Sequence, residues 1–363
     1  MVKKMKDKIA VLFIGLLLLS VFSSGCINLN AESDGETVTI TDMTGREVQV
    51  PKEIDEVVGI EAGALRLLVY MQATDLVSGV ENFEKDDGLR PYIMAHPELQ
   101  DKTSIGPIHG GNPELILDLN PDVIFWTYTE AGNADDLQKK TGIPVIALKY
   151  GDLDDNRETF FEALDTIGKV LDKTERAQEI QNYIENTIYD LNQRTEDIPE
   201  DEKSSCYVGG IGYKGAHGIK STEPDYSPFE FVNAKNVAGE LTTEHAMVDP
   251  EKIVDWNPEK LFIDEGGYDL LVDDIKNNEL YKSIDAIKND ETYAVMPFNY
   301  YTANYGTILA DAYYVGKVLF PERFEDINPQ EKADEIYREL VGEEVYDDME
   351  ENFGGFKKVN LKE

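Results

Sequence analysis

The sequence predicts an α/β protein of two similar lobes, each built on a parallel sheet, joined by one long rigid helix. A fourteen-residue phrase occurs twice, as NPELILDLNPDVIF at 112–125 and DPEKIVDWNPEKLF at 249–262, with seven identical positions. Strand-like and helix-like segments alternate on both sides of a long helical stretch, which is typical of parallel α/β sheets. The alternative is a chance similarity of two ordinary α/β units, since Asn-Pro turns are common.

Each copy of the phrase predicts one helix, one turn and one strand. Pro113 and Pro250 suit the first turn of a helix, where φ is fixed and no donor is lost. Apolar residues then follow at helical spacing, and Asn-Pro ends the helix. The apolar run after it predicts a short buried strand. Two lobes on one plan enclose a cleft, and clefts between lobes bind small ligands.

The first lobe is predicted over residues 37–154. It opens with a β-hairpin, because TVTITDMTGREVQV alternates in polarity around a Met-Thr-Gly turn. Strands and helices then alternate along the chain. The predicted elements are the hairpin 37–50, strand 57–60, helix 63–71, strand 76–80, the first repeat helix, strand 123–126, helix 135–141 and strand 145–148.

The connecting helix is predicted over 155–197. Residues 155–196 contain no Pro and only Gly168, and apolar residues recur at helical spacing. One helix of that length measures about 60 Å at 1.5 Å per residue. A break near Gly168 or at 171–173 is the alternative. Lobe closure around such a stiff connection is expected to be small.

The second lobe is predicted over 203–345. It begins with a strand at 205–208 and repeats the alternation of the first lobe. The last stretch, 346–363, is predicted to be an exposed polar tail. The predicted elements are helices 227–233 and 250–256, strand 261–264, helix 269–277, strand 293–295, and helices 304–320 and 329–342.

The N-terminus predicts a lipoprotein signal peptide over 1–25. Four lysines precede an uncharged apolar run, and Ser-Ser-Gly then leads to Cys26. Cys26 would carry the lipid, and the polar residues 26–36 would form a tether. Cys206 is the only other cysteine, so an acylated Cys26 leaves no intramolecular disulfide. An uncleaved signal anchor and plain secretion are the alternatives.

The chain is strongly acidic. Its formal net charge is −38, and removal of the leader, which carries +3, leaves −41. Such a charge disfavours nucleic acid and anionic lipid surfaces, both of which need a basic protein face. The same charge keeps the protein soluble.

Several phrases resemble one family. The first half contains ITDMTGREVQVP at 40–51, PELILDLNPDVIF and TGIPVIALKYG, and the second half contains PFEFVNAKNV at 228–237, PEKIVDWNPEKLF and AYYVGKVLFPERF. These phrases are similar to the extracellular solute-binding proteins of ABC importers for ferric siderophores, haem and cobalamin. The resemblance covers about residues 36–345. It implies a class III solute-binding fold, no enzymatic activity and no intrinsic cofactor.

The same resemblance implies the ligand and the partners. The ligand would be an iron chelate, haem or a corrinoid, captured at the extracellular face of the cell membrane by a lipid-anchored monomer. The partners would be an ABC permease and its ATPase. The alternatives are a receptor for a bare transition-metal ion and a chelatase-like enzyme; the chain lacks a nucleophile elbow, an HExxH motif and a cysteine cluster.

The ligand is expected beyond the carboxyl ends of the strands, which is where open α/β sheets bind ligands. The loop 209–218, GGIGYKGAHG, has five glycines that let the backbone approach a ligand, and it lacks the spacing of a nucleotide-binding loop. Aromatic rings near strand ends can stack on a planar chelate. Core packing and incidental loop positions are the alternatives. The candidate cleft residues are Glu61, Trp126, Tyr128, Tyr150, Tyr213, Lys214, His217, Asn299, Tyr300 and Tyr301.

A metal site would need about three converging ligands. The four histidines are far apart in sequence, and His109 and His217 are the candidates because they fall in cleft loops, one from each lobe. Separate polar contacts are the alternative. For permease docking, the family uses an acidic residue on each lobe. Glu230 matches the second-lobe position, whereas the first lobe has Arg66 where the acid is expected, with Glu61 nearby.

Overall fold

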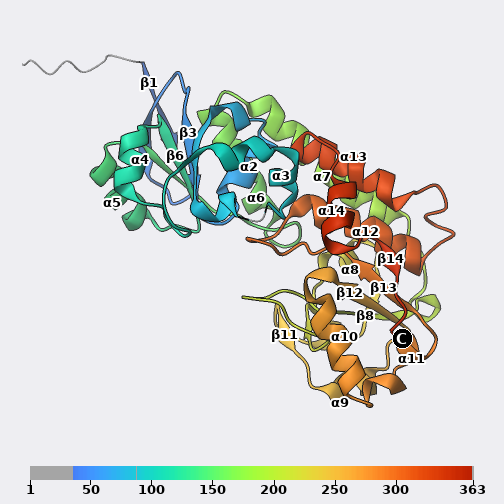
Figure 1. Ribbon diagram of the computed structural model, residues 1–363. Helices are drawn as coiled ribbons and strands as arrows, with labels where there is room; N and C mark the ends of the chain where they lie inside the picture. The colour runs from blue at the N-terminus through green and yellow to red at the C-terminus, as the bar shows by residue number, and fades with distance from the viewer. Residues whose placement is uncertain (1–35, 87, 362–363) are drawn as a thin grey trace, which may run out of the picture. The chain divides into compact units, whose positions relative to one another are not determined.

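The computed structural model of this chain describes residues 36–86 and 88–361. The predicted leader, Cys26 and nearly all of the tether lie outside the described residues. Residues 37–361 belong to one structural unit (Figure 1). None of the described helices is both long and apolar enough to cross a bilayer.

The first lobe is built on a sheet of five parallel strands in the order β5-β4-β3-β6-β7. β3 and β7 are buried along their whole length, as expected for parallel strands covered on both faces. α4 and α5 cover one face of this sheet and α2 and α6 the other. The strands are β3 Val57–Ile60, β4 Val77–Val80, β5 Thr103–Ser104, β6 Val123–Thr127 and β7 Val145–Leu148.

An antiparallel hairpin precedes this sheet, as predicted. Asp42 closes its turn, because its carboxylate accepts hydrogen bonds from the backbone N–H groups of Thr44 and Arg46, both at 3.0 Å. The hairpin strands are β1 Thr37–Thr41 and β2 Glu47–Pro51, and the helices of the first lobe are α2 Ala64–Tyr70, α3 Pro91–Ala95, α4 Pro113–Leu119 and α5 Ala131–Thr141. Short 3-10 turns at Thr74–Leu76, Asn82–Lys85 and Pro97–Asp101 join them.

The second lobe repeats the plan with the strand order β10-β8-β12-β13-β14, in which only β14 is antiparallel to its neighbour. A small antiparallel pair, β9 and β11, lies beside it. The strands are β8 Ser205–Gly209, β9 Ser221–Thr222, β10 Lys235–Asn236, β11 Ala246–Met247, β12 Lys260–Asp264, β13 Thr292–Val295 and β14 Lys357–Lys358. The helices are α8 Ser227–Phe231, α9 Pro250–Trp256, α10 Tyr268–Asn277, α11 Asp285–Lys288, α12 Tyr305–Leu319, α13 Pro329–Val341 and α14 Tyr346–Phe353, with 3-10 turns at Glu200–Glu202, Val237–Glu240, Glu265–Gly267 and Tyr281–Ser283.

The repeated phrase forms the same unit in both lobes, α4–β6 and α9–β12. Each helix has proline in its first turn and ends at an asparagine in the left-handed conformation, Asn120 at φ 54° and Asn257 at φ 45°. Asparagine tolerates this conformation at a helix end, and the following proline cannot continue the helix. The predicted duplication is therefore confirmed as two equivalent helix–turn–strand units.

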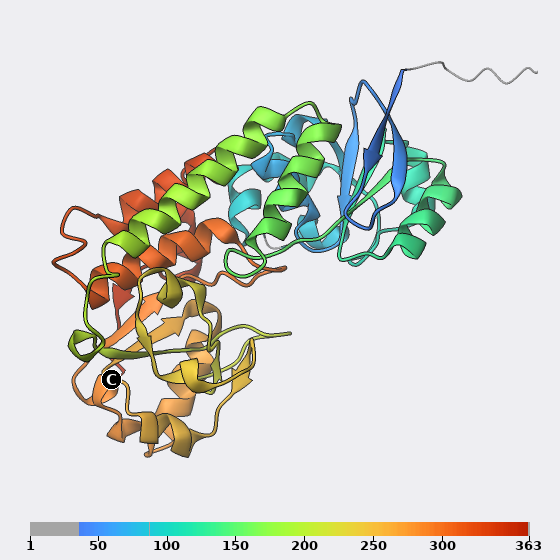
Figure 2. The same ribbon diagram turned by 180° about the vertical axis from the view of Figure 1, so that it is seen from behind.

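The predicted connection at 155–197 is not one continuous helix but two, α6 Arg157–Val170 and α7 Thr174–Gln193, so the alternative of a break at 171–173 is confirmed. Asp172 adopts φ 54°, which breaks the helix between them. α6 packs back against α7 (Figure 2), and Gly168 permits the close approach because a Cβ there would lie 3.3 Å from that of Ala177. Only α7, about 30 Å long at 1.5 Å per residue, continues to the second lobe, where it contacts α8 and α12.

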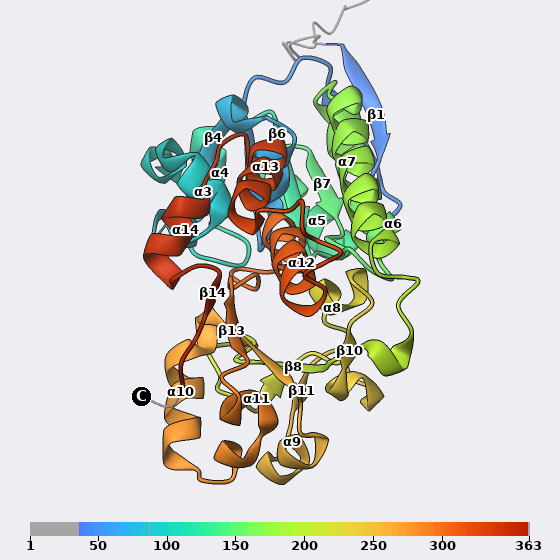
Figure 3. The same ribbon diagram turned by 90° about the vertical axis from the view of Figure 1, so that its right-hand side faces the viewer.

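The predicted exposed tail at 346–363 is also wrong within the described residues. α14 packs on α13, and β14 extends the second-lobe sheet beside β13 (Figure 3). Tyr346, Met349 and Val359 are buried. The sequence signal was weak because the apolar residues of this stretch are scattered among many charged ones. The backbone of Val359 pairs with Thr292.

This segment gives a stability prediction. Removing residues 356–363 should lower the free energy of unfolding by about 3 kcal/mol, because burial of each Val or Leu side chain contributes about 1.5–3 kcal/mol and both Val359 and Leu361 are buried. Urea unfolding measures the change. An unchanged midpoint would show that the segment is dispensable, as an exposed tail would be.

One apolar core joins the two lobes. The same cluster contains Phe125 and Leu148 of the first sheet, Ile180 of α7, and Phe262 and Val295 of the second sheet. C-terminal helix α13 contacts α2 and α3 of the first lobe, and His96 Nε2 bonds to the carbonyl oxygen of Val341 at 2.7 Å. A shared core of this kind supports the expectation that the lobes close only slightly on each other.

Candidate functional site

The backbone marks the carboxyl ends of the strands as unusual. Non-glycine residues with positive φ divide into two groups among those described. One group consists of Asn, Asp and Gln residues just after helix ends, where such residues tolerate the left-handed conformation. The other consists of larger or branched side chains in loops that follow β3, β5, β6, β8 and β13. These are Glu61, His109, Tyr128, Lys214, Tyr301 and Thr302.

The left-handed backbone conformation of this second group is energetically costly. A side chain held in a sparsely populated region costs on the order of 1–3 kcal/mol and persists where the surrounding structure enforces it. Such strain concentrates at functional sites. Both lobes contribute, and five of the six residues or their loops were predicted from the strand-end rule. The strained loops therefore define the candidate ligand cleft.

Glu81 organises the first-lobe side of this cleft. Its side chain is buried and accepts hydrogen bonds from the backbone N–H groups of Glu61 at 3.0 Å and Gly110 at 2.9 Å. It also accepts one from the hydroxyl of Tyr301 at 2.8 Å. Burial raises the pKa of Glu81 above its ordinary value, although these three donors oppose the shift. Glu81 thus fixes two cleft loops and ties them to a loop of the other lobe.

Glu61 and His109 form a pair on the first-lobe side of the candidate cleft. The carboxylate of Glu61 contacts Nδ1 of His109. The His109 side chain is 61% exposed and that of Glu61 15%, so both are accessible from solvent. The pair offers a ligand one carboxylate and one imidazole from the same lobe.

The loop 299–304 crosses from the second lobe to the first and is held there by Arg66. Arg66 is fully buried and donates to the carbonyl oxygens of Ala303 at 2.8 Å, Tyr301 at 3.0 Å and Tyr300 at 3.2 Å. It also donates to the hydroxyl of Tyr150. Convergence of several carbonyls on one guanidinium explains how the left-handed pair Tyr301 and Thr302 is maintained.

Arg66 stands where the resemblance implies a docking acid. It lies in α2, every residue of which is buried, so its guanidinium is engaged inside the protein. Glu230, the second-lobe docking candidate, is exposed on α8.

The aromatic residues in this part of the cleft form one layer. The ring centroids of Tyr301 and Phe83 are 4.3 Å apart, and those of Tyr300 and Phe83 6.2 Å apart. The guanidinium of Arg90 lies 4.7 Å from the centroid of Phe83 and 5.6 Å from that of Tyr300. Tyr128 is 58% exposed, and its hydroxyl bonds to Oγ1 of Thr302 across the lobes at 2.8 Å. These rings offer apolar surface with polar edges.

Two other predicted aromatics differ in their access to the cleft. Tyr150 is buried, and its hydroxyl donates to the carbonyl oxygen of Ala303 at 2.8 Å. It supports the loop 299–304 from behind and is not open to a ligand. Trp126, at the carboxyl end of β6, is partly exposed, and a Cβ on Gly110 would lie 3.7 Å from its ring.

The glycine-rich loop 209–218 forms the second-lobe side. The exposed ring of Tyr213 stacks on His245 with centroids 4.2 Å apart, and Nζ of Lys214 lies 5.3 Å from the Tyr213 ring. His217 Nε2 bonds to the carbonyl oxygen of Tyr213 at 2.7 Å. Asn299 is exposed and donates to the carbonyl oxygen of Gly212 at 2.8 Å, which joins this loop to 299–304.

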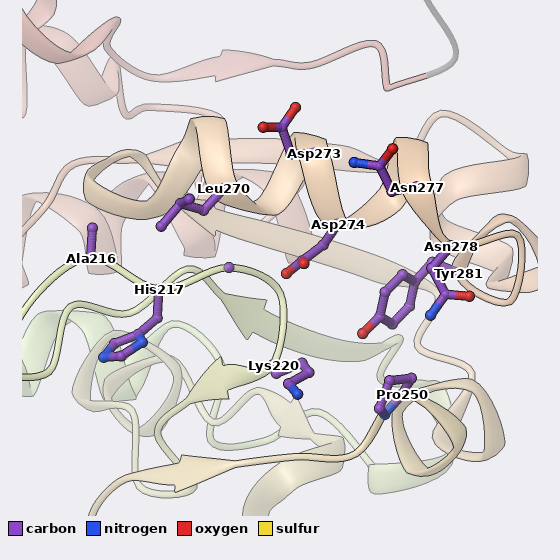
Figure 4. A pocket seen from close by; sticks show the side chains of 11 residues that line it. Ala216, His217, Lys220, Pro250, Leu270, Asp273, Asp274, Asn277, Asn278 and Tyr281 are labelled. Atoms are coloured by element: carbon purple, nitrogen blue, oxygen red, sulfur yellow. The ribbon is translucent and has the colours of Figure 1, made fainter.

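A pocket of about 470 Å³ lies behind the same loop (Figure 4). His217, Gly218 and Lys220 form one side, and Asp274 of α10 faces them. A Cβ on Gly218 would meet the carboxylate of Asp274, which would then have to shift. This pocket belongs to one lobe and contains none of the strained side chains, so we place the candidate site at the strained loops, with His217 adjoining both.

The structure pairs the histidines differently from the sequence prediction. His109 pairs with Glu61 in the first lobe, whereas His217 lies beside His245, with ring centroids 6.4 Å apart. Within the described residues, no group of three or more His, Cys, Asp or Glu side chains is placed to hold a metal ion. Cys206 is buried in β8, where burial raises its thiol pKa, so it offers no reactive thiolate.

Sequence reasoning missed Glu81, Phe83 and His245. Glu81 directly follows β4 and could have been found by the strand-end rule that selected Glu61. Phe83 is two residues further along the same loop. His245 precedes a two-residue strand that no apolar pattern indicates, so nothing in the sequence connected it with Tyr213.

A family model matches more than half of this chain, and curated relatives match most of it. The model of a family described as periplasmic binding protein matches residues 69–297. Curated relatives include a molybdate-binding protein of Haemophilus influenzae, 26% identical over 83% of this chain and 90% of the relative. From Bacillus subtilis they include a petrobactin-binding protein (24%, 78% and 89%) and an Fe(3+)-citrate-binding protein (26%, 79% and 89%).

Solved structures share the fold. A periplasmic solute-binding protein of Veillonella parvula superposes with a TM-score of 0.70 at 19% identity, over 88% of this chain and 97% of that one. The molybdate-bound protein of Haemophilus influenzae gives 0.66 at 22% identity, over 85% and 98%. The two-lobed α/β fold of this chain, with parallel sheets, is that of these binding proteins.

Proposed function

This chain belongs to the periplasmic binding protein family, the solute-binding components of ABC transporters, and we propose that its solute is a metal chelate. The class includes iron chelates, haem and corrinoids. The observation that carries this proposal is the set of strained loops from both lobes, which present aromatic rings and a few polar groups. Such sites combine apolar contact area with a small number of orienting polar groups.

The chemistry of the cleft supports an organic chelate over a small oxyanion such as the molybdate of one relative. Tyr128 and Tyr213 offer exposed ring surface that a tetrahedral oxyanion cannot use. The guanidinium of Arg66 is occupied by the carbonyl groups of the loop 299–304. Two of the curated relatives are named for binding Fe(3+)-citrate and iron(3+)-hydroxamate, which agrees with this choice.

Membership of the family implies delivery of the solute to an ABC permease. We propose that Glu230, exposed on α8, pairs with a basic residue of the permease, and that the ATPase then drives import. Rim charges of this kind fix register and association rate more than affinity. Cys26 would hold the protein to the outer face of the cell membrane by its lipid, and the protein would release its ligand unchanged.

Intrinsic fluorescence tests the ligand class. Trp126 lies at the cleft end of β6, whereas Trp256 ends α9 near the amino end of β12, where its Nε1 donates to Glu240 at 2.9 Å. We expect a ferric hydroxamate, ferric citrate, haem or cobalamin to quench the intrinsic fluorescence of the wild-type protein and of the Trp256→Phe variant. Trp126→Phe should lose most of that quenching while it still binds.

The same titration distinguishes a metal chelate from an oxyanion or a bare metal ion as the ligand. Molybdate represents the oxyanion, and Zn²⁺ represents a bare transition-metal ion. If either of these raised the melting temperature while every chelate left both fluorescence and melting temperature unchanged, the chelate proposal would be wrong. Turnover of any bound chelate in the absence of a permease would favour an enzyme.

A further inference from the structure

The tip of the loop 299–304 lies against the first lobe, although both ends of the loop belong to the second. Asn299 and Ala303 form an isolated antiparallel bridge at its base, so the loop is a closed turn. From the amino end of α12 it projects toward the first lobe (Figure 1). Residues 300–302 form its tip, and they reach the candidate cleft from the opposite lobe.

The main chain of this tip and the side chain of Tyr301 are held by different groups. The buried guanidinium of Arg66 holds the main chain, because it donates to the carbonyl oxygens of Tyr301 at 3.0 Å and Ala303 at 2.8 Å. The Tyr301 side chain has one hydrogen-bond partner among the described residues, Glu81, to which its hydroxyl donates at 2.8 Å. Rotation about its own bonds can therefore move this side chain away while Arg66 keeps the main chain in place.

Tyr301 covers the groups of the first lobe that a solute would use. Its ring packs on Phe83 with centroids 4.3 Å apart. Its hydroxyl binds the carboxylate of Glu81, which also orders the loops of Glu61 and Gly110. An aromatic ring beside a polar acceptor is typical of ligand sites. Tyr301 therefore takes the place that a solute would have on the first lobe.

The backbone of the tip shows that this contact is enforced. Tyr301 and Thr302 adopt φ 52° and φ 62° in succession. This left-handed conformation is uncommon for a bulky residue and rarer still for a β-branched one. Such conformations persist where the surrounding structure enforces them, and they concentrate at functional sites. Here they accompany the contact of the Tyr301 side chain with Glu81 across the lobes.

Departure of Tyr301 leaves Glu81 with fewer donors. The backbone N–H groups of Glu61 and Gly110 remain on its carboxylate, whereas the hydroxyl is lost. A solute group that donates to Glu81 compensates for that loss, because a buried acceptor is costly to leave unpaired. Solute entry and departure of Tyr301 therefore favour each other. The closed position of Tyr301 also keeps the apparent affinity below that of the open cleft, since only the open fraction can bind.

We propose that Tyr301 is an autoinhibitory gate of the cleft: its side chain covers Glu81 and Phe83 in the ligand-free protein and moves off them when the solute binds. Arg66 retains the main chain of the loop in both states. This inference rests on the proposed function and adds the regulation of its site.

Tyr301→Phe tests the gate because it keeps the ring and removes the bond to Glu81. Stopped-flow quenching of Trp126 in the Trp256→Phe background measures the binding of ferric citrate, a ferric hydroxamate, haem and cobalamin. Every chelate that binds should associate about fivefold faster with Tyr301→Phe, the effect of one net hydrogen bond lost from the closed state. Dissociation rates should stay the same.

Three outcomes of these kinetics would overturn the gate. Slower association or weaker affinity in Tyr301→Phe would make Tyr301 a solute contact, and equal rates would show that its hydroxyl does not restrain entry. Tyr189→Phe is the matched control, because Tyr189 is 65% exposed on α7. Its replacement should leave the rates unchanged, and an equal acceleration there would remove the assignment to Tyr301.

A fluorine label tests the gate without a solute. Burial raises the pKa of Tyr301, and the carboxylate of Glu81 raises it further. Glu84, Glu61 and the ring of His109 also face this side chain. In the ligand-free protein, 3-fluorotyrosine at position 301 should keep its proton at a pH where free 3-fluorotyrosine has ionised, as read from its fluorine chemical shift. Saturation with a binding chelate should bring its pKa toward that of the free amino acid. Ionisation like the free amino acid in the ligand-free protein would overturn the gate.

Failure of the gate is distinguishable from failure of the proposed function. Chelates that bind wild type and Tyr301→Phe at equal rates, without changing the label at 301, would leave the proposed function standing and remove the gate. If no chelate bound either protein, the proposed function would fail. A label at 301 that keeps its proton would then retain the closed contact with Glu81 and reject these chelates as the solutes that open it.

Discussion

Replacing Arg66 with Met is expected to lower the free energy of unfolding by about 3–5 kcal/mol, because several buried acceptors lose their donor at once. The carbonyl oxygens of Tyr300, Tyr301 and Ala303 converge on this guanidinium. The Tyr150 hydroxyl and the Asn304 amide would still donate to Ala303 and Tyr300. Guanidine hydrochloride unfolding measures the loss. Ligand affinity should fall as well, since Arg66 holds the strained loop in place.

Arg323→Met provides the matched control. Arg323 pairs with Asp197, and both side chains are about half exposed, so the change should cost less than about 1 kcal/mol. Hydrogen exchange adds a readout specific to the loop: amides of 299–304 should lose protection in Arg66→Met and keep it in Arg323→Met. Equal stability of the two variants would show that Arg66 does not hold the lobes together.

Asp311→Asn is expected to stabilise the protein at neutral pH by about 1–3 kcal/mol, because the neutral amide removes the cost of burying a carboxylate beside those of Asp264 and Glu265. Asp311 is fully buried in α12; its Oδ1 accepts from the Met296 N–H at 3.0 Å, whereas Oδ2 lacks a hydrogen-bond partner among the described residues. Burial raises the pKa of Asp311 well above its ordinary value, and repulsion by the carboxylates of Asp264 and Glu265 raises it further.

The pH dependence follows from the direction of that shift. An unfolded aspartate titrates near pH 3.9, whereas the folded protein holds the proton on Asp311 to higher pH. Between these two pKa values the folded state binds more protons, so stability decreases as the pH rises above about 4. Asp311→Asn should reduce this decrease. Urea unfolding at several pH values from 4 to 8 gives the free energy of unfolding as a function of pH. The plots for wild type and variant would be parallel if Asp311 were ionised throughout.

The architecture was largely predictable because periodicity and turn residues report local structure. The duplicated phrase contains its own proline start and Asn-Pro stop, and both copies form the predicted units. The break between α6 and α7 was an alternative at 171–173; apolar spacing could not decide it, because it depends on the left-handed Asp172 and on close packing at Gly168. The C-terminal strand β14 was missed because its stability comes from pairing with β13, far away in sequence.

The cleft was predictable to the level of loops and less so to the level of side chains. The strand-end rule selected the loops of Glu61, Tyr128, Lys214 and Tyr301, all of which have strained backbones. The direction of a side chain from such a loop depends on tertiary partners. Tyr150 turns inward because the Ala303 carbonyl and Arg66 bind its hydroxyl. The pairing of Tyr213 with His245 joins segments that no local pattern connects.

Hydrogen exchange with and without ligand tests the central claim, that the solute binds among the strained loops of both lobes. With the chelate that quenches Trp126, we expect new protection in the loops 59–64, 106–111, 126–130, 209–218 and 297–304, from both lobes together. Protection confined to α10 and the residues around Asp273 and Asn277, which line the pocket of Figure 4, would contradict the account and place the ligand on the flank of the second lobe.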